Sequence, residues 1–523
     1  MSINTLRQRW QARSGRQSWQ LGLRRLLAGK LYLGLVSILL AALITSGCGG
    51  SSSAPATSTG TGGLYTLISD TPSCDVLGFA LFLTEVDLHR QGSSSTSKLT
   101  VYPTSISPFA PTVEMTELRD TSAIANLTSI NAGTYDQAIL TVTVDSASIY
   151  DPSATPPASS LTTNITSTNI TVNIQPPLVV TKGAVNVLQL DFNLPQSLEV
   201  DSQGQLTGNV TPVFTARPIT LSATSGFTDL GVLEGFVTSV TNTSTGTGFT
   251  GAFALQTLSG NGPALSVNLT DTTQLLGVDR LDQMPTGTFV EVDGYIDGNG
   301  NYVAKSAQVE GRSDISQQNL AYLGQVLTVT RDSNGNATQF AMLVHHTEPA
   351  DLVNIKTNQL VTVNVSPSTT YTPYSLSSDL SSLASGGNLT FGAQTLAPGQ
   401  EIVVHGIYTV PATGLVSVAA DQIYQRMQSV QGDFSSLIQA GSDDKTGAFH
   451  FLPCSGLVAG TPFTVVTDAQ TQFVNAIGLS SLSPTTPLLA RGLSFRDVLG
   501  GTVNGVPVPA GTMVVLANHV RQF

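Results

Sequence analysis

The chain is poor in charged, aromatic, cysteine and histidine residues. Charged residues make up 11% of its 523 residues and aromatic residues 6%, with three cysteines and six histidines. These counts argue against a disulfide-rich scaffold and against a cysteine–histidine metal framework. Beyond the first 47 residues the sequence has no basic patch, which argues against a nucleic-acid-binding surface. Beyond the first 47 residues it has no long helical periodicity, which excludes a helical bundle.

The N-terminal leader is the most informative segment that is present. An arginine-rich stretch precedes an apolar run from Leu31 to Ile44, and small residues then lead to Cys48. The apolar run is shorter than the about 20 residues that a transmembrane helix needs. This order resembles a bacterial lipoprotein signal, which implies cleavage before Cys48 and acylation of its thiol. We therefore expect residues 1–47 to form a helical, cleaved signal peptide, with an uncleaved anchor as the alternative.

The part that follows the leader is strongly acidic. Seven of the 22 Lys and Arg residues precede Cys48 and none of the 34 Asp and Glu residues does, so 15 bases remain against 34 acids. Such a surface repels phosphate backbones, and we expect no nucleic-acid partner. The expected partners are the membrane, through the lipid on Cys48, and an envelope polysaccharide or protein. Gly49 after Cys48 resembles lipoproteins of the outer membrane.

Cys74 and Cys454 are the two remaining thiols in an oxidising compartment. A disulfide would require their Cα atoms to lie within about 7 Å. The two residues fall in the expected first and last folded modules, so the sequence leaves open whether they pair.

Short, β-branched, alternating segments dominate the rest of the chain. They are separated by turn residues, and the Asp297 and Asp332 turns each contain Asn-Gly or Gly-Asn, which supplies the backbone angles of tight hairpins. A short helix at 376–383 is the one helical candidate. The pattern predicts an all-β, modular protein. The clearest strands are Phe79–Leu88, Ala138–Val144, Phe289–Val292, Val361–Val365 and Ile402–Val404.

Residues 48–63 are expected to be a flexible Gly/Ser/Thr tether, and residues 64–220 the first domain. The motifs Leu67–Pro72, Phe82–His89, Val113–Leu118 and Asn131–Gln137 lie in this domain. Together they resemble domain of unknown function 4382. The resemblance implies a β-sandwich-like domain and no established activity.

Three units of about 100 residues follow, at 228–312, 321–426 and 428–523. Each opens on an apolar segment around a glycine (Gly235, Gly324 and Gly432) and has a middle strand that ends in a threonine with a bulky residue two positions later (Thr273, Thr369 and Thr471). The units resemble domain of unknown function 5666, which implies small OB-like β-barrels. We expect few contacts to cross residues 427–430, so that a fragment ending at Arg426 folds without the last unit.

Motifs of nucleophilic catalysis are present only as fragments. Ser95 and Lys98 match Ser-x-x-Lys, and Lys445-Thr446-Gly447 matches a second motif of penicillin-binding enzymes. The chemistry requires the serine at a helix start beside a Lys-Thr-Gly strand. Here Ser95 falls in a serine-rich loop, and Lys445 in a turn between two short strands. We expect no catalytic residue.

The candidate ligand-binding residues also have structural interpretations. His345 and His346 should point to opposite faces of a strand that ends at the surface, so they should not share a metal ion. The Asp297 and Asp332 turns lack the twelfth-position acid of a calcium loop. Asp70 and Asp136 are read as turn residues. We expect no metal and no cofactor, and Cys48 as the only site residue.

Taken together, the sequence predicts a lipid-anchored envelope protein of structural or ligand-binding type, without catalytic activity. The alternative is an envelope glycan hydrolase whose paired carboxylates are not recognisable in sequence. A cleft lined by paired acids would favour the alternative, whereas filled barrels would favour binding.

Overall fold

The computed structural model describes residues 60–523 except 72, 95, 100–111, 203–204, 222–225, 229, 243–247, 258–263, 310–319, 349–354, 374–388, 462, 485 and 504. The described residues belong to one compact unit, Ser58–Phe523. The signal peptide, Cys48, Ser95 and the helix predicted at 376–383 lie outside the described residues. Within them, no helix is long and apolar enough to cross a membrane.

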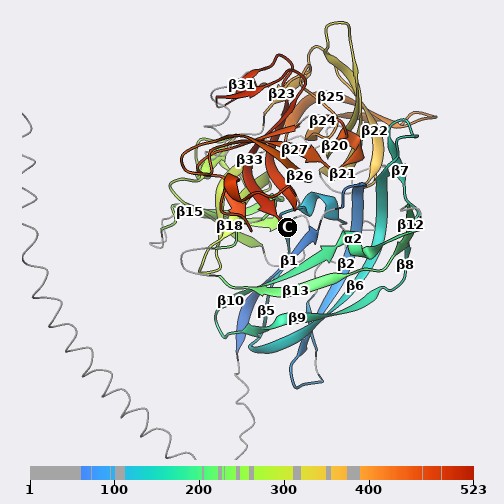
Figure 1. Cartoon of the computed structure of the whole chain (residues 1–523). Helices are drawn as coiled ribbons and strands as arrows, with labels where there is room; N and C mark the ends of the chain where they lie inside the picture. Colours follow the sequence, from blue (N-terminus) through green and yellow to red (C-terminus); the bar gives the residue numbers. More distant parts are fainter. Residues whose placement is uncertain are drawn as a thin grey trace, which may run out of the picture. The chain divides into compact units, whose positions relative to one another are not determined.

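The described chain is nearly all β, as predicted, and its α2 helix has four residues (Figure 1). The first domain contains a ten-stranded sheet curved around one apolar core. Eight strands follow the order β3-β2-β6-β9-β13-β10-β1-β5, while β4 pairs with β2 and β7 pairs with β6 beside this path. β1 begins at Thr61, so residues 61–63 belong to a strand and not to the predicted tether. The elements are β1 (Thr61–Thr71), β2 (Val76–Arg90), β3 (Thr96–Leu99), β4 (Val113–Glu114), the 3₁₀ turn η2 (Met115–Leu118), β5 (Ser122–Asn131), β6 (Gly133–Tyr150), β7 (Ala158–Ser160), β8 (Asn164–Ile165), β9 (Asn169–Val180), β10 (Val185–Asn193), α2 (Leu194–Ser197), β11 (Leu198–Val200), β12 (Leu206–Val210) and β13 (Phe214–Ile219).

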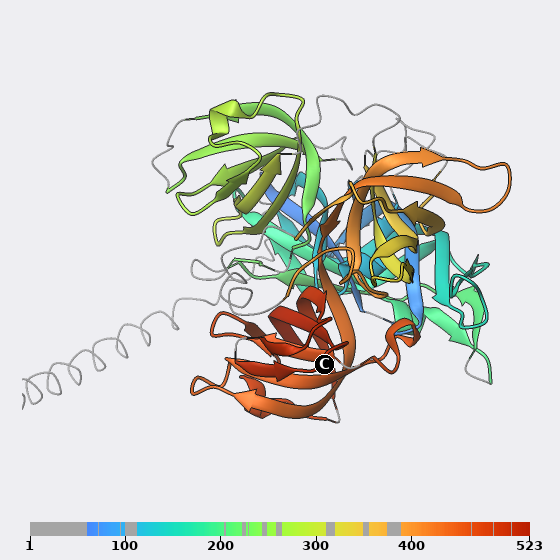
Figure 2. The same cartoon turned by 90° about the horizontal axis from the view of Figure 1, so that it is seen from above.

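The three repeats each form a six-stranded sheet, and the strand order is the same in all three. Repeat 1 has the order β16-β15-β14-β18-β19-β17, and an additional pairing of β16 with β19 closes it into a barrel. Figure 2 shows the three groups of strands in green, orange and red. The strands are β14 (Leu233–Thr241), β15 (Gly251–Thr257), β16 (Leu265–Leu269), β17 (Gln274–Leu276), β18 (Phe289–Ile296) and β19 (Tyr302–Val309) in repeat 1; β20 (Leu320–Arg331), β21 (Ala337–Glu348), β22 (Gln359–Asn364), β23 (Thr370–Thr372), β24 (Glu401–Thr409) and β25 (Val416–Gln425) in repeat 2; and β26 (Met427–Ala440), β27 (Gly447–Pro453), β28 (Phe463–Thr467), β29 (Gln472–Val474), β30 (Pro487–Arg496), β31 (Gly501–Val503), β32 (Val506–Val508) and β33 (Met513–Gln522) in repeat 3. Short 3₁₀ turns lie at Leu281–Gln283 (η3), Gly456–Val458 (η4) and Leu479–Ser481 (η5).

The shared threonine explains part of the repeat pattern. Its hydroxyl donates to a backbone carbonyl of the closing strand in every unit: Thr273 to Ala304 at 2.7 Å, Thr369 to Ala420 at 2.7 Å and Thr471 to Ala517 at 2.8 Å. Each bond ties the middle of the unit to its last strand. The Asp297 and Asp332 tips are hairpin turns, because each carboxylate accepts from two backbone N–H groups of its own turn.

A bulge recurs where the two long hairpin strands of each barrel meet. The register shifts between His405 and Gly406 in repeat 2 and between Arg491 and Gly492 in repeat 3. A Cβ on Gly406 would lie 2.2 Å from the Ala419 carbonyl oxygen, and one on Gly492 would lie 1.9 Å from that of Leu516. Glycine is therefore required here because the paired backbones approach closely.

Repeats 2 and 3 share a core, so the expectation that few contacts cross residues 427–430 is wrong. One apolar cluster includes Val326 and Val404 of repeat 2 together with Phe495 and Leu516 of repeat 3. All five residues of β28 are buried: Phe463 and Val465 belong to the core of their own barrel, and Val466 belongs to the apolar cluster that repeats 2 and 3 share.

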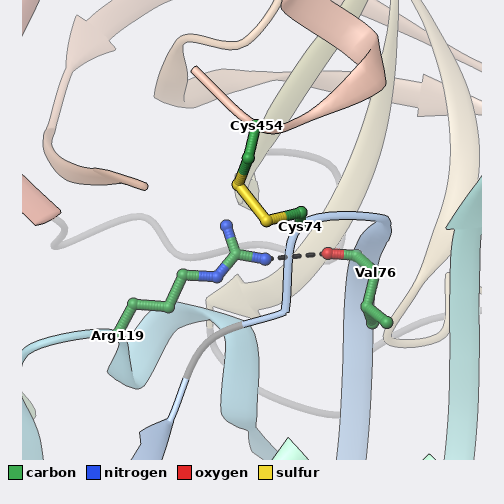
Figure 3. Close-up of a disulfide and its surroundings, with 4 residues drawn as sticks. All are labelled: Cys74, Val76, Arg119 and Cys454. Carbon is green, nitrogen blue, oxygen red and sulfur yellow. Dashed lines mark hydrogen bonds between the residues drawn. A yellow bond between two sulfur atoms is a disulfide. The ribbon is translucent and has the colours of Figure 1, made fainter. Parts of the chain in front are cut away.

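A disulfide joins Cys74 of the first domain to Cys454 of repeat 3, with their Cα atoms 5.4 Å apart. This answers the question that the sequence left open. Beside it, the guanidinium of Arg119 donates to the Val76 carbonyl at 2.8 Å (Figure 3). The bridge closes a chain segment of 380 residues and ties the beginning of the fold to its end.

We expect the double variant Cys74→Ser, Cys454→Ser to unfold at lower urea concentration than the wild type. Removing a cross-link over a long loop costs about 2–5 kcal/mol of stability. Equilibrium urea unfolding with and without reductant measures this. Reductant should destabilise the wild type and leave the variant unchanged; equal stability of the oxidised wild type and the variant would contradict the expectation.

Candidate functional site

One stretch of the first domain, residues 112–122, contacts the other three modules, and we call it the junction segment. It leaves the sheet at β4, makes the turn η2 and re-enters at β5. Its Ser122 carbonyl accepts from the Gly231 N–H of repeat 1 at 2.9 Å, just before β14. Its Arg119 carbonyl accepts from the Ser429 hydroxyl of repeat 3 at 2.7 Å. The segment therefore lies where the modules meet.

Glu114 fixes the start of the junction segment against repeat 2. Its Oε1 accepts from the backbone N–H of Phe79 at 2.7 Å and from the hydroxyl of Thr116 at 2.8 Å. Its Oε2 accepts from the side-chain amide of Asn358 in repeat 2 at 2.8 Å. A buried carboxylate with this many donors is stably held, which assigns Glu114 a structural role.

Asp120 fixes the end of the segment against repeat 3. Its side chain has no exposed surface, and its two oxygens lie 2.6 Å from Nδ1 of His519 and 2.7 Å from Nε of Arg521. Both partners belong to β33, the last strand of the chain. A buried carboxylate without its partners strongly destabilises a fold. The last strand therefore has to stay packed against the first domain, and this cluster links the two.

A cavity of about 250 Å³ lies along the junction segment. Its lining comes from every module: Glu117 of the first domain, Asp293 of repeat 1, His345 and Glu401 of repeat 2, and Arg491 of repeat 3. Two smaller polar pockets adjoin it and share Thr121 with it. The junction is thus the place where charged side chains of all four modules face a common space.

His345 is the most deeply buried group in this cavity, with 2% of its surface exposed. The sequence reading of His345 as the surface end of a strand is wrong. The register of β21 against β20 shifts here, since Leu323 pairs with His346 and Gly324 pairs with Val344, which leaves His345 without an opposite residue. Such a bulge breaks the alternation of side chains and re-aims one of them, and both histidines line the cavity.

Glu117, His345 and Glu401 meet in the cavity. Nδ1 of His345 lies 3.6 Å from Oε1 of Glu117 and 3.6 Å from Oε2 of Glu401. Nε2 of His345 lies 3.0 Å from the Leu77 carbonyl oxygen. Sequence reasoning missed both glutamates because they are distant in the chain and match no motif.

The three groups shift one another's pKa values. Burial opposes ionisation of Glu117, but its interactions with His345 and with the charge of Arg426 outweigh burial and lower its pKa to about 2. Burial also opposes protonation of His345, but the charges of Glu401 and Glu117 raise its pKa to about 9. Burial raises the pKa of Glu401. The two carboxyl groups therefore differ in their affinity for a proton.

The remaining candidate residues are placed apart from the cavity or have structural roles. Lys98 forms an ion pair with Glu85 at 2.6 Å. The turn of Lys445 is held by Asp443, which accepts from the N–H groups of Lys445 and Thr446, as the turn interpretation predicts. Asp136 is a residue of β6 and not a turn residue as predicted, and its Oδ1 lies 2.8 Å from Nδ1 of His89.

Asp70 is not a turn residue, as the sequence suggested, but a buried residue of β1 with 4% of its surface exposed. Its backbone forms an isolated parallel β-bridge with the backbone of Arg119 in the junction segment, and Asp70 lines one of the polar pockets. Burial raises the pKa of its carboxyl group well above the ordinary value, against the lowering effect of Arg119.

Two family models match the chain. The Domain of unknown function DUF4382 matches residues 61–209, and the Domain of unknown function DUF5666 matches residues 234–307. The second match covers repeat 1, and the common strand order extends the same architecture to repeats 2 and 3. These are the two families that the residue motifs indicated.

No curated protein matches the chain. Among solved structures, a single-stranded DNA binding protein from Thermus aquaticus is 13% identical and covers 40% of this chain and 95% of its own, with a TM-score of 0.12. The structure titled "drosophila Unr CSD456" is 10% identical, covering 56% of this chain and 98% of its own, with a TM-score of 0.13. Likeness at these TM-scores carries no argument about function or partners.

We expect Asp120→Asn to lower the free energy of unfolding by about 3–5 kcal/mol, because it leaves the buried His519 and the partly exposed Arg521 without their charged partner. Asp136→Asn is the matched control, since it removes a carboxylate from a half-exposed histidine pair. Urea denaturation should give a far smaller change for the control. Equal effects of the two substitutions would mean that the Asp120 cluster does not hold the fold.

As the pH rises from about 4 to about 8, we expect the free energy of unfolding of Asp70→Asn to increase relative to that of the wild type. The raised folded-state pKa means that wild-type Asp70 keeps its proton when folded and loses it when unfolded, so wild-type stability falls with rising pH above the unfolded value of 3.8. The asparagine variant lacks this loss. Thermal unfolding of both proteins across this pH range measures the difference in stability. If the wild type instead became more stable than the variant with rising pH, Asp70 would be ionised and paired with Arg119.

Proposed function

We propose that this chain is a lipid-anchored protein of the cell envelope that binds an envelope ligand without turning it over. The order of basic region, apolar run, small residues and Cys48 supports the anchor and an outer-membrane location. The Cys74–Cys454 disulfide supports an oxidising compartment. Acylated Cys48 is the membrane contact in this proposal, and an envelope polysaccharide or protein is the ligand.

The observation that carries the binding role is the junction cavity. The barrel interiors are filled by their own side chains, such as Phe253 and Val267 in repeat 1 and Phe449 and Val515 in repeat 3. The described space that faces charged and polar groups of every module is instead at the junction segment. Ligand sites commonly occur between domains, where groups from several elements converge.

An envelope glycan hydrolase is the second candidate, and one observation favours it. Glu117 and Glu401 face the same cavity with pKa values displaced in opposite directions, as an acid and a carboxylate in a glycosidase require. However, the imidazole of His345 lies 3.6 Å from both carboxylates. It occupies the place where a sugar ring would have to sit, so the geometry favours binding over glycoside hydrolysis.

The anchor is tested by Cys48→Ser in the producing bacterium. We expect the wild type to incorporate a fatty-acid probe and to sediment with membranes, and the variant to do neither, because the thiol is the acylated group. Cys74→Ser is the control for loss of a thiol and should still incorporate the probe. Labelling of Cys48→Ser would contradict the assignment.

The ligand-binding role is tested on the compact unit Ser58–Phe523. It is incubated with peptidoglycan, envelope polysaccharides, and chromogenic ester and glycoside substrates. Retention on an envelope component without product formation supports the proposal. Turnover that is abolished by Glu117→Gln or Glu401→Gln would establish the hydrolase in its place.

A further inference from the structure

The orientation of His345 is fixed by the backbone of the first domain. Its Nε2 lies 3.0 Å from the carbonyl oxygen of Leu77. A carbonyl oxygen only accepts hydrogen bonds, so Nε2 carries the hydrogen and Nδ1 is the atom that faces Glu117 and Glu401. Metal-ligating histidines usually donate the N–H of their other ring nitrogen to a carboxylate or a backbone carbonyl, and His345 has this arrangement.

Nδ1 of His345 has no hydrogen-bond partner although the residue is almost completely buried. Its 3.6 Å separations from Oε1 of Glu117 and Oε2 of Glu401 exceed hydrogen-bond length. The three ligand atoms all lie within 4.8 Å of one another. Zinc–ligand bonds of about 2.1 Å at tetrahedral angles would separate two ligand atoms by about 3.4 Å, so the observed spacing suits a shared ion.

We propose that Glu117, His345 and Glu401 form a binding site for a divalent transition-metal ion, with zinc as the best-suited ion. Two carboxylates and one imidazole are a ligand set for zinc, whereas calcium takes more ligands and only oxygens. The three side chains come from the first domain and from two strands of repeat 2, so the ion fastens these modules together. The cavity provides a place for a fourth ligand, water or an anionic group.

The surrounding charges limit the affinity of this site. A guanidinium nitrogen of Arg426 lies 3.9 Å from Oε1 of Glu117, and Arg119 acts on Glu401. Both weaken the attraction for a cation, while Glu114 adds a third buried carboxylate near His345. The competing occupant is a proton on Nδ1, which would make His345 an imidazolium held between two carboxylates.

Zinc binding by the full chain, purified in detergent and stripped with a chelator, tests the proposal. After zinc is added and excess removed, we expect elemental analysis to find close to one zinc per chain. Calorimetric titration should give saturable binding, and zinc should raise the thermal unfolding temperature. Cobalt added in place of zinc should bind at the same site and show the visible absorption of a low-coordinate ion.

Glu117→Gln, Glu401→Gln and His345→Gln should each weaken zinc binding by about tenfold or more. His450→Gln is the matched control, because His450 is an exposed residue of β27, and it should bind zinc as the wild type does. Circular dichroism identifies any variant that fails to fold. A folded wild type that retains no zinc, or binding that all three cluster variants leave unchanged, would overturn the proposal and assign the site to a proton.

Discussion

The buried carboxylate of Asp120 is the constraint on which the arrangement of the modules depends. It has no exposed surface and lies against His519 and Arg521 of the final strand. Its neighbours along residues 112–122 bond to repeat 2 through Glu114 and to Gly231 of repeat 1 through Ser122. Burying this charge is favourable only while its partners are in place. The last strand must therefore pack against the first domain for the Asp120 carboxylate to have its partners. The Cys74–Cys454 disulfide joins the same two modules.

This arrangement also gives the protein its polar interior space. The centres of the barrels hold apolar side chains, such as Phe253 in repeat 1 and Phe449 in repeat 3. Where the barrels meet the junction segment, buried charges remain, and they surround the space that contains Glu117, His345 and Glu401. The proposed binding role and the proposed metal site both follow from how the modules are joined rather than from any one module.

Local properties could be predicted from the sequence, and long-range properties could not. Strands such as Phe79–Leu88 and Ala138–Val144 follow from alternation, and the repeats follow from glycines and threonines at fixed places, because these features act over a few residues. The Cys74–Cys454 pairing, the shared core of repeats 2 and 3, and the meeting of Glu117 with Glu401 depend on packing between distant segments. His345 was misread for a local reason: one bulge opposite Gly324 reverses the expected side-chain direction.

The most direct test of this account is the unfolding of a fragment that ends at Arg426. Without repeat 3, the buried Asp120 loses both of its partners, Cys74 loses Cys454, and the apolar face that Val326 and Val404 share with Phe495 is exposed to water. The account predicts a fragment that binds a hydrophobic dye and unfolds without a cooperative transition, while the full chain unfolds in one transition. A fragment that unfolds cooperatively, at the denaturant concentration of the full chain, would contradict it.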